Sequence, residues 1–248
     1  MAQAFFEHWF VDFEFPNEDG KPYKSSGGEM VESELGRIPK GWTVGSVSDM
    51  GEVIGGATPS KKEEDYFTQN GIPWITPKDL SNTNDLFIER GSIDITEQGL
   101  KNSSVRKMPK CTVLFSSRAP IGYIAISKNE ITTNQGFKSI VPAKKQGFSS
   151  MYVFCWLKEN TDIIKNRATG STFKEISGSE MKKINTIIPP KNILDMFKNI
   201  QYDLFKKIKV TESENKILEN IRDTLLPKLM SGEIRVPLHQ EEEGEEVS

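Results

Sequence analysis

The stretch VLFSSRAPIGYIAI, Val113 to Ile126, decides the fold class, because an apolar strand pattern is interrupted by a charged turn and then resumes. Val113 to Phe115 predict a buried strand, and Gly122 to Ile126 predict the strand that returns beside it. Ser116 to Pro120 are expected to form the turn, which holds Arg118 out on a stiff hairpin. The sequence therefore predicts a β-hairpin that presents a cation.

A second polar turn follows the hairpin. The segment TNQGFKSIVP, Thr133 to Pro142, predicts another strand that is entered through a turn rich in amide side chains. Arg, Asn, Gln and Lys carry the donors and acceptors that match base edges and phosphates. Any single one of them is as well explained as a solvated loop residue, but several together favour a nucleic-acid surface.

The composition is that of a folded protein with a basic middle. The 248 residues are 36% hydrophobic, which is enough for one substantial domain and an accessory element. Residues 37–191 carry 22 Lys and Arg against 15 Asp and Glu, whereas residues 1–36 carry two Lys against eight acids. A basic domain between acidic ends is a moderate indication of a polyanion partner.

Membrane, redox and metal chemistry find little support in the sequence. No apolar run approaches about 18 residues, and the first residues lack the features of a signal peptide, so we expect a cytoplasmic protein. Cys111 and Cys155 predict buried free thiols. The two histidines, His8 and His239, lie outside the basic domain, which argues against histidine catalysis and zinc.

Spacing also disfavours three further chemistries. VIGGATPSKK, Val53 to Lys62, is rich in glycine but lacks the GK[ST] of a phosphate loop. The carboxylates of Asp79, Asp94 and Glu97 match no metal spacing typical of a nuclease and are interpreted as solvated surface. IIPPK, Ile187 to Lys191, differs from the Asn/Asp-Pro-Pro-aromatic element of adenine methyltransferases. The chain is therefore not expected to catalyse a reaction by itself.

The order of patterns predicts an α+β fold. The expected parts are a short helix at 1–15, a turn-rich linker at 16–34, a globular domain at 35–190, a long helix at 191–232 and an acidic flexible tail at 233–248. Within the domain, short strands are expected at Trp74–Ile75, Thr112–Phe115, Tyr123–Ile126, Phe137–Val141 and Ile184–Ile188. One helix, from Ser149 to about Arg167, interrupts them.

Both terminal helices carry apolar faces that need a partner. The first has aromatic residues largely on one face, from Phe5 to Phe13. The long helix carries a stripe of Phe197, Ile200, Leu204, Ile208, Leu218, Ile221 and Leu225. Its 40 residues would span roughly 60 Å, more than capping the domain needs, so a coiled coil is favoured over packing on the chain's own domain. Pro227 is expected to kink or tighten its last turns.

Six ordered motifs resemble one known family. They are GGATPSKK (Gly55–Lys62), GIPWITPKDL (Gly71–Leu80), VLFSSRAPIGYIAI, TNQGFKSIVP, ATGSTFKEISGSEMKKINTIIPP (Ala168–Pro190) and LLPKLMSGEI (Leu225–Ile234). Over nearly its whole length the chain resembles the specificity subunit of Type I restriction-modification systems. MAQAFFEHWFVDFEF resembles the end of that family's central helical region, so the chain resembles a second half, one target recognition domain plus a conserved helix, either natural or truncated.

The resemblance implies a non-catalytic component that reads double-stranded DNA. The recognition domain would read one half of a bipartite site, and the helices would act as spacer and docking surface. Modification subunits would bind S-adenosylmethionine and methylate adenine, and a restriction subunit would use ATP to cleave unmodified DNA. The chain itself is expected to bind no cofactor or metal and to form a homodimer through its apolar helical faces.

Candidate DNA-binding residues come from the polar turns. They are Thr58, Ser60, Lys61, Lys62, Lys78, Arg118, Asn134, Gln135, Lys138, Ser171, Thr172 and Lys174, while Gly122, Gly136 and Gly170 are expected to serve turns. Two alternatives stay open. A self-contained DNA-modifying enzyme would need catalytic motifs that the sequence lacks, and a coiled-coil interaction protein without DNA affinity would not need a basic middle domain.

Overall fold

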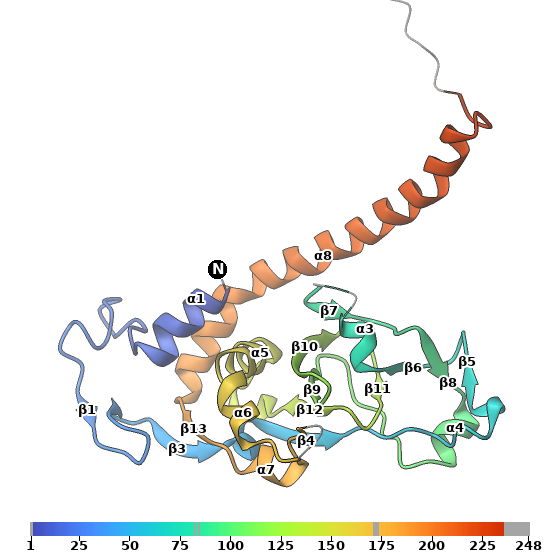
Figure 1. Cartoon of the computed structure of the whole chain (residues 1–248). Coiled ribbons are helices and arrows are strands. Elements are labelled where there is room, and N and C mark those ends of the chain that lie inside the picture. The colour runs from blue at the N-terminus through green and yellow to red at the C-terminus, as the bar shows by residue number, and fades with distance from the viewer. Residues whose placement is uncertain (1, 82, 84, 171–173, 236–248) are drawn as a thin grey trace, which may run out of the picture. The chain divides into compact units, whose positions relative to one another are not determined.

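The computed structural model describes residues 2–81, 83, 85–170 and 174–235 (Figure 1). The chain divides into two compact units, Met1–Lys206 and Lys207–Ser248. The first unit mixes strands and helices as predicted, and the long helix α8 runs from Lys191 to Met230 across the boundary. We expected the domain to end at residue 190. The first turns of α8 belong to it, because Ile193 and Leu194 are buried in its core.

A five-stranded sheet forms the centre of the first unit (Figure 1). Its order is β4 (Gly51–Gly55), β12 (Lys138–Pro142), β9 (Val113–Ser117), β10 (Ile121–Ser127) and β7 (Phe87–Ile88). The predicted hairpin is confirmed as β9 and β10, which pair antiparallel. All of β9 is buried, as its unbroken apolar start requires.

Three smaller sheets complete the strands. One has the order β11 (Thr132–Thr133), β6 (Ile72–Ile75), β8 (Ile93–Ile95) and β5 (Phe67–Thr68), and the others pair β1 (Met30–Val31) with β2 (Ile38–Pro39) and β13 (Asn185–Ile188) with β3 (Thr43–Ser46). The predicted strands thus correspond to β6, β9, β10, β12 and β13. Apolar residues of the two larger sheets, among them Ile75 and Leu114, share one core cluster.

Short helices cover the strands. They are α2 (Val47–Met50), α3 (Pro77–Ser81), α4 (Glu97–Lys101), α5 (Ser150–Glu159), α6 (Thr161–Arg167) and α7 (Gly178–Lys182), with 3-10 turns at Glu64–Tyr66 and Lys144–Gln146. The single helix expected from Ser149 is two helices, because Asn160 ends α5. Its side chain donates to the Trp156 carbonyl at 2.9 Å, a local bond that competes with the helical ladder.

The aromatic N-terminal segment packs inside the first unit. It forms α1 (Ala2–Phe6) and a π-helical turn (Glu7–Val11), so the helix ends before the expected residue 15. The ring centroid of Phe10 lies 4.8 Å from that of Phe197 and 4.9 Å from that of Tyr152. The expectation that this face requires another copy is therefore wrong. The assignment of Phe197 to a partner surface is wrong as well, because the side chain is 1% exposed.

The second unit is the later part of α8, described to residue 235. Pro227 lies inside the helix, which continues to Met230. Of the predicted stripe, Leu218, Ile221 and Leu225 are exposed in this unit and Ile208 is half-buried. In the part of α8 that belongs to the first unit, Ile200 is exposed and Leu204 is half-buried. No helix among the described residues is long and apolar enough to cross a membrane.

Candidate nucleic-acid interface

Three loops that carry candidate residues meet at one end of the central sheet. Gly55, the last residue of β4, is paired with Lys138, the first residue of β12. Ser116, near the end of β9, bridges Phe137 just before β12. Because β4 and β9 both run antiparallel to β12, the loops after β4 and β9 and the loop before β12 lie at the same end of the sheet. We call this end of the sheet the sheet-end surface; it comprises residues 56–62, 117–118, 134–138 and 174–175.

The loop after β4 rests on the turn before β12. The Gly56 amide donates to the Phe137 carbonyl at 3.3 Å, and the Ala57 amide donates to the Thr133 carbonyl at 3.0 Å. A Cβ at Gly56 would lie 1.9 Å from the Asn134 carbonyl oxygen, so the approach requires glycine. These contacts bring the half-buried Thr58 to the exposed Gln135, and the Thr58 hydroxyl bonds the Gln135 side-chain oxygen.

Asn134 shapes this turn as well as lying on the surface. Its side-chain oxygen accepts from the Gly136 backbone amide at 2.8 Å, and the Asn134 backbone amide donates to the Ile75 carbonyl at 2.9 Å. The Pro77 ring lies 3.0 Å from the Cβ position of Gly136, so α3 begins against the turn. The exposed Lys78, the next residue of α3, is thereby brought beside the sheet-end surface.

Arg118 and Lys138 lie together around a carboxylate that the sequence analysis did not identify. Arg118 Nη1 lies 3.4 Å from Glu175 Oε2, and Lys138 Nζ lies 3.0 Å from Glu175 Oε1. Lys138 also donates to Ser117 Oγ at 3.3 Å. The Lys138 side chain is 13% exposed and that of Arg118 is 36% exposed. Both cations are therefore held by side chains of the protein. Arg118 does not stand out freely in solvent, although the hairpin pattern alone predicted that it would.

The remaining candidates have simpler positions. Ser60, Lys61, Lys62 and Lys174 are exposed, and the Ser60 carbonyl accepts from the Glu63 amide in a turn at 3.3 Å. Ser171 and Thr172 lie outside the described residues. The sheet-end surface therefore brings together Thr58, Gln135, Asn134, Arg118 and Lys138 from separate parts of the sequence. Lys174 is next to Glu175 in the chain, and Lys78 lies beside the surface.

Of the three carboxylates interpreted as solvated surface, Glu97 is exposed as expected, whereas Asp79 and Asp94 are held by hydrogen bonds within the fold. Asp94 is 1% exposed, because its carboxylate bonds Arg90 and accepts from the Gly71 amide at 2.8 Å, so that interpretation is wrong for Asp94. Burial raises the pKa of Asp79, but hydrogen bonds from Thr76 and Ser92 outweigh it and hold the pKa below its usual value. Among the described residues no group of three His, Cys, Asp or Glu side chains could hold a metal ion.

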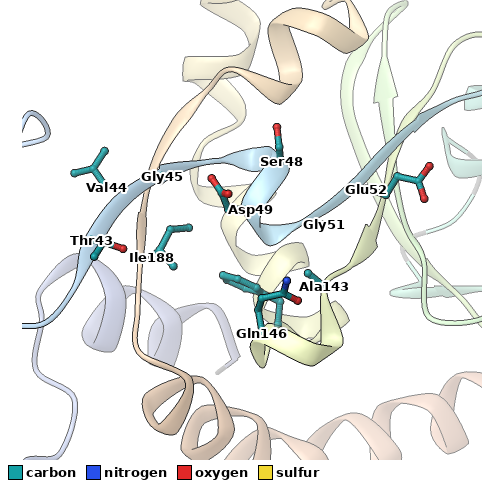
Figure 2. A pocket seen from close by; sticks show the side chains of 11 residues that line it. Thr43, Val44, Gly45, Ser48, Asp49, Gly51, Glu52, Ala143, Gln146 and Ile188 are labelled. Carbon is teal, nitrogen blue, oxygen red and sulfur yellow. The ribbon is translucent and has the colours of Figure 1, made fainter.

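A pocket of the first unit lies away from the candidate residues. Its volume is about 580 Å³, and its lining includes Thr43, Ser48, Asp49 and Gln146 (Figure 2). Gly51 and Ala143 place it beside the start of β4 and the residue after β12, which is the opposite end of those strands from the sheet-end surface. The Asp49 carboxylate accepts from the Ser46 amide and hydroxyl at 2.7 and 2.9 Å, so it caps α2.

The first unit carries polar loops at one end of its central sheet, and α8 carries exposed apolar residues. Both features are suited to binding. The family described as Type I restriction modification DNA specificity domain matches residues 39–223, and the chain belongs to this family. The resemblance inferred from the six motifs is thereby confirmed.

Curated relatives carry the same description. The chain is 43% identical over 195 residues to the Type I restriction enzyme MjaIX specificity subunit of Methanocaldococcus jannaschii, a match that covers 78% of this chain and 44% of the relative. It is 31% identical over 212 residues to the HindI specificity subunit of Haemophilus influenzae, covering 83% of this chain and 46% of the relative. The chain thus spans about half the length of these relatives. They are named specificity subunits, in agreement with the expectation of a non-catalytic component.

Solved structures share the fold. The HsdS subunit from Thermoanaerobacter tengcongensis aligns with a TM-score of 0.51 at 15% identity over 92% of this chain and 49% of that one. The S subunit of a Type-I restriction-modification system from M. genitalium aligns with a TM-score of 0.52 at 16% identity over 77% of this chain and 46% of that one. The α+β fold predicted from the sequence is therefore that of known specificity subunits.

Proposed function

We propose that this chain supplies DNA sequence specificity to a Type I restriction-modification complex by reading one half of a bipartite site. The observation that carries the proposal is the sheet-end surface, where amide, hydroxyl and basic side chains from separate segments lie on one edge of a rigid sheet. Membership of a DNA specificity family supports DNA as the ligand of that surface, and in this proposal the DNA is double-stranded. A DNA ligand also favours the cytoplasmic location expected from the sequence.

The side chains divide by the chemistry of what they can contact. Gln135 is exposed and its amide can pair with the N6 and N7 edge of adenine, while an arginine such as Arg118 matches the O6 and N7 edge of guanine. Lys61 and Lys62 lie on an exposed loop and suit phosphates, which position a protein without reading sequence. A good bidentate base contact contributes about 1–3 kcal/mol of discrimination.

Catalysis would come from partner subunits that dock on the helical regions. In this proposal the modification subunits bind S-adenosylmethionine and methylate adenine, and the restriction subunit binds ATP. The chain contributes binding and position, and no methyl donor site is assigned to it. Neither a self-contained modifying enzyme nor a coiled-coil protein without DNA affinity is favoured by a specific observation.

Substitutions on the sheet-end surface test the DNA assignment in the assembled complex. Arg118→Ala, Gln135→Ala and Lys61→Ala are compared with Lys40→Ala, whose ammonium pairs with Glu29 at 2.8 Å in the β1–β2 region. Loss of a base contact should relax the sequence preference at one position and cost about 1–3 kcal/mol of binding free energy. Loss of a phosphate contact should weaken binding to all sequences and reduce by about 1 the slope of log affinity against log salt concentration. Unchanged affinity and choice in all three variants would show that the surface is misplaced.

We also propose that two copies associate through exposed apolar residues of α8. Leu218, Ile221 and Leu225 continue at steps of three and four residues, which is the spacing of a helical pairing seam. A symmetric pair would present two recognition domains to a symmetric bipartite site. Leu204→Lys with Leu218→Lys should lower the mass measured by light scattering. Asp223→Lys should not, because at about 100° per residue this exposed position lies roughly opposite the seam on α8. A wild-type chain that is strictly monomeric at tens of micromolar would contradict the pairing.

A further inference from the structure

Glu175 lies between two cations, Lys138 and Arg118. Neither the family match nor the sequence analysis gives this carboxylate a role. Each carboxylate oxygen has its own partner, Lys138 Nζ at 3.0 Å and Arg118 Nη1 at 3.4 Å. The cluster of two cations and one anion therefore carries a net charge of +1 where the cations alone would present +2. A phosphate approaching this part of the sheet-end surface meets a weaker field than the basic side chains by themselves would give.

The backbone holds Glu175 in place from both sides. The Thr169 amide donates to the Glu175 carbonyl at 3.1 Å, and the Glu175 amide donates to the Thr169 carbonyl at 2.9 Å. The next residue, Ile176, is fully buried and its amide donates to the Ser117 carbonyl at 3.1 Å. The carboxylate is thus fixed against the end of β9, and its contacts to Arg118 and Lys138 do not depend on a freely moving loop side chain.

The two cations differ in how easily they can exchange partners. Lys138 is largely buried and bonds both Glu175 and Ser117, so it stays with the carboxylate. Arg118 is more exposed, and its 3.4 Å contact is longer than the 2.7–2.9 Å typical of a strong charge-assisted bond. Arg118 can therefore leave Glu175 for a ligand while Lys138 keeps the carboxylate paired, which avoids an isolated buried charge in the bound state.

We infer that Glu175 is a specificity-determining residue of the sheet-end surface, an inference that rests on the proposed DNA-reading function. Its carboxylate restrains Arg118 and repels phosphates. It yields the guanidinium to a base edge that offers acceptors in place of Glu175 Oε2, such as guanine O6 and N7. Glu175 lowers affinity for DNA of any sequence, and the correct half-site recovers that loss. Specificity then arises from a penalty on wrong sites as well as from contacts to the right one.

The test compares Glu175→Gln, which keeps the shape and removes the charge, with the wild-type chain assembled with its modification subunit. The probes are a duplex carrying the site that the wild-type complex selects from a randomised library and a duplex with that site scrambled. Removing a charge several ångströms from a phosphate should tighten binding to the scrambled duplex at least about threefold. If Arg118 gains a phosphate contact, the salt slope should steepen by about 0.9. Binding to the selected site should change less, so discrimination falls.

Two further variants make the result decisive. Glu175→Asp keeps the charge and should retain weak binding to the scrambled duplex. Glu52→Gln removes a carboxylate that bonds Arg106 at 3.0 Å on β4 at the other end of the sheet, and it should leave discrimination unchanged.

Equal discrimination by wild type and Glu175→Gln would overturn the inference. So would a loss of thermal stability with equal weakening on both duplexes, which would make the cluster only a structural ion pair. A wild-type complex that selects no site would contradict the proposed function itself and this inference with it.

Discussion

Phe197 and Leu218 lie on the same predicted apolar stripe of α8, yet the structure gives them opposite surroundings. The Phe197 side chain is 1% exposed, and its ring centroid lies 4.8 Å from that of Phe10, 5.9 Å from that of Trp9 and 6.2 Å from that of Phe6. Leu218 is 61% exposed. Truncating the first should therefore destabilise the domain strongly, and truncating the second should have little effect on its stability.

The expected cost of Phe197→Ala follows from this burial. Removing a fully buried phenylalanine costs about 3–5 kcal/mol, because apolar transfer is lost and a cavity remains. The aromatic neighbours place the value in the upper part of that range, since edge-to-face pairs add about 0.5–1.5 kcal/mol beyond burial. Leu218→Ala should change the free energy of unfolding by no more than about 0.5 kcal/mol, the usual range for exposed positions.

Urea unfolding followed by tryptophan fluorescence measures both variants, with Trp9 reporting directly on the cluster around Phe197. The midpoint should fall strongly for Phe197→Ala and stay near that of the wild type for Leu218→Ala. Light scattering on the same samples reports association. If Phe197→Ala cost less than about 1 kcal/mol and lowered the oligomeric mass, Phe197 would face a partner as the stripe alone suggested, and the assignment to the core would be refuted.

Three smaller predictions concern the hairpin and the cysteines. Ser116→Ala should destabilise the domain by about 2 kcal/mol in urea unfolding, because the buried hydroxyl accepts from the Gly122 and Tyr123 amides at 3.1 and 2.8 Å and their loss leaves two donors unpaired. Burial raises the pKa of the Cys155 thiol to about 12 from its ordinary 9, so the unfolded thiol ionises first. The contribution of the neutral thiol to the free energy of unfolding should be complete below about pH 9 and should be lost as the pH rises from there to about 12. Cys155→Ala should make the free energy of unfolding fall less over that range. A thiol reagent at pH 8 should label the half-buried Cys111 before the buried Cys155 in the native chain, and equal rates would contradict their placement.

Local patterns predicted three strands of the central sheet, β9, β10 and β12, together with β6 and β13. The β9–β10 hairpin follows from a continuous apolar run, a turn and a second apolar run within fourteen residues, a distance over which sequence order largely dictates pairing. The sheet-end candidates were found for a related reason, because polar turns at strand ends are visible in sequence. Their meeting at one edge needed the order β4-β12-β9, which joins strands far apart in the chain.

Long-range partners were not visible in the sequence. Glu175 lies 57 residues from Arg118 and 37 from Lys138, and nothing in a run of residues links a carboxylate to cations at such separations. The stripe that includes Phe197 identified an apolar helical face correctly, but periodicity does not say what covers a face. The aromatic residues near the start of the chain cover Phe197, whereas Leu218 of the same stripe is exposed. Asp94 was misplaced for the same reason, since its burial depends on bonds from Arg90 and Gly71.

Methylation by the reconstituted complex tests the central claim most directly. The chain, its modification subunit and tritiated S-adenosylmethionine are combined with varied duplex DNA, each protein is also assayed alone, and methylated positions are mapped by sequencing. The account predicts no incorporation by the chain alone and adenine methylation at one bipartite sequence when both are present, with the half-site changed or lost in Gln135→Ala. Reproducible incorporation by the homogeneous chain alone, or methylation by the modification subunit that is indifferent to this chain, would contradict it.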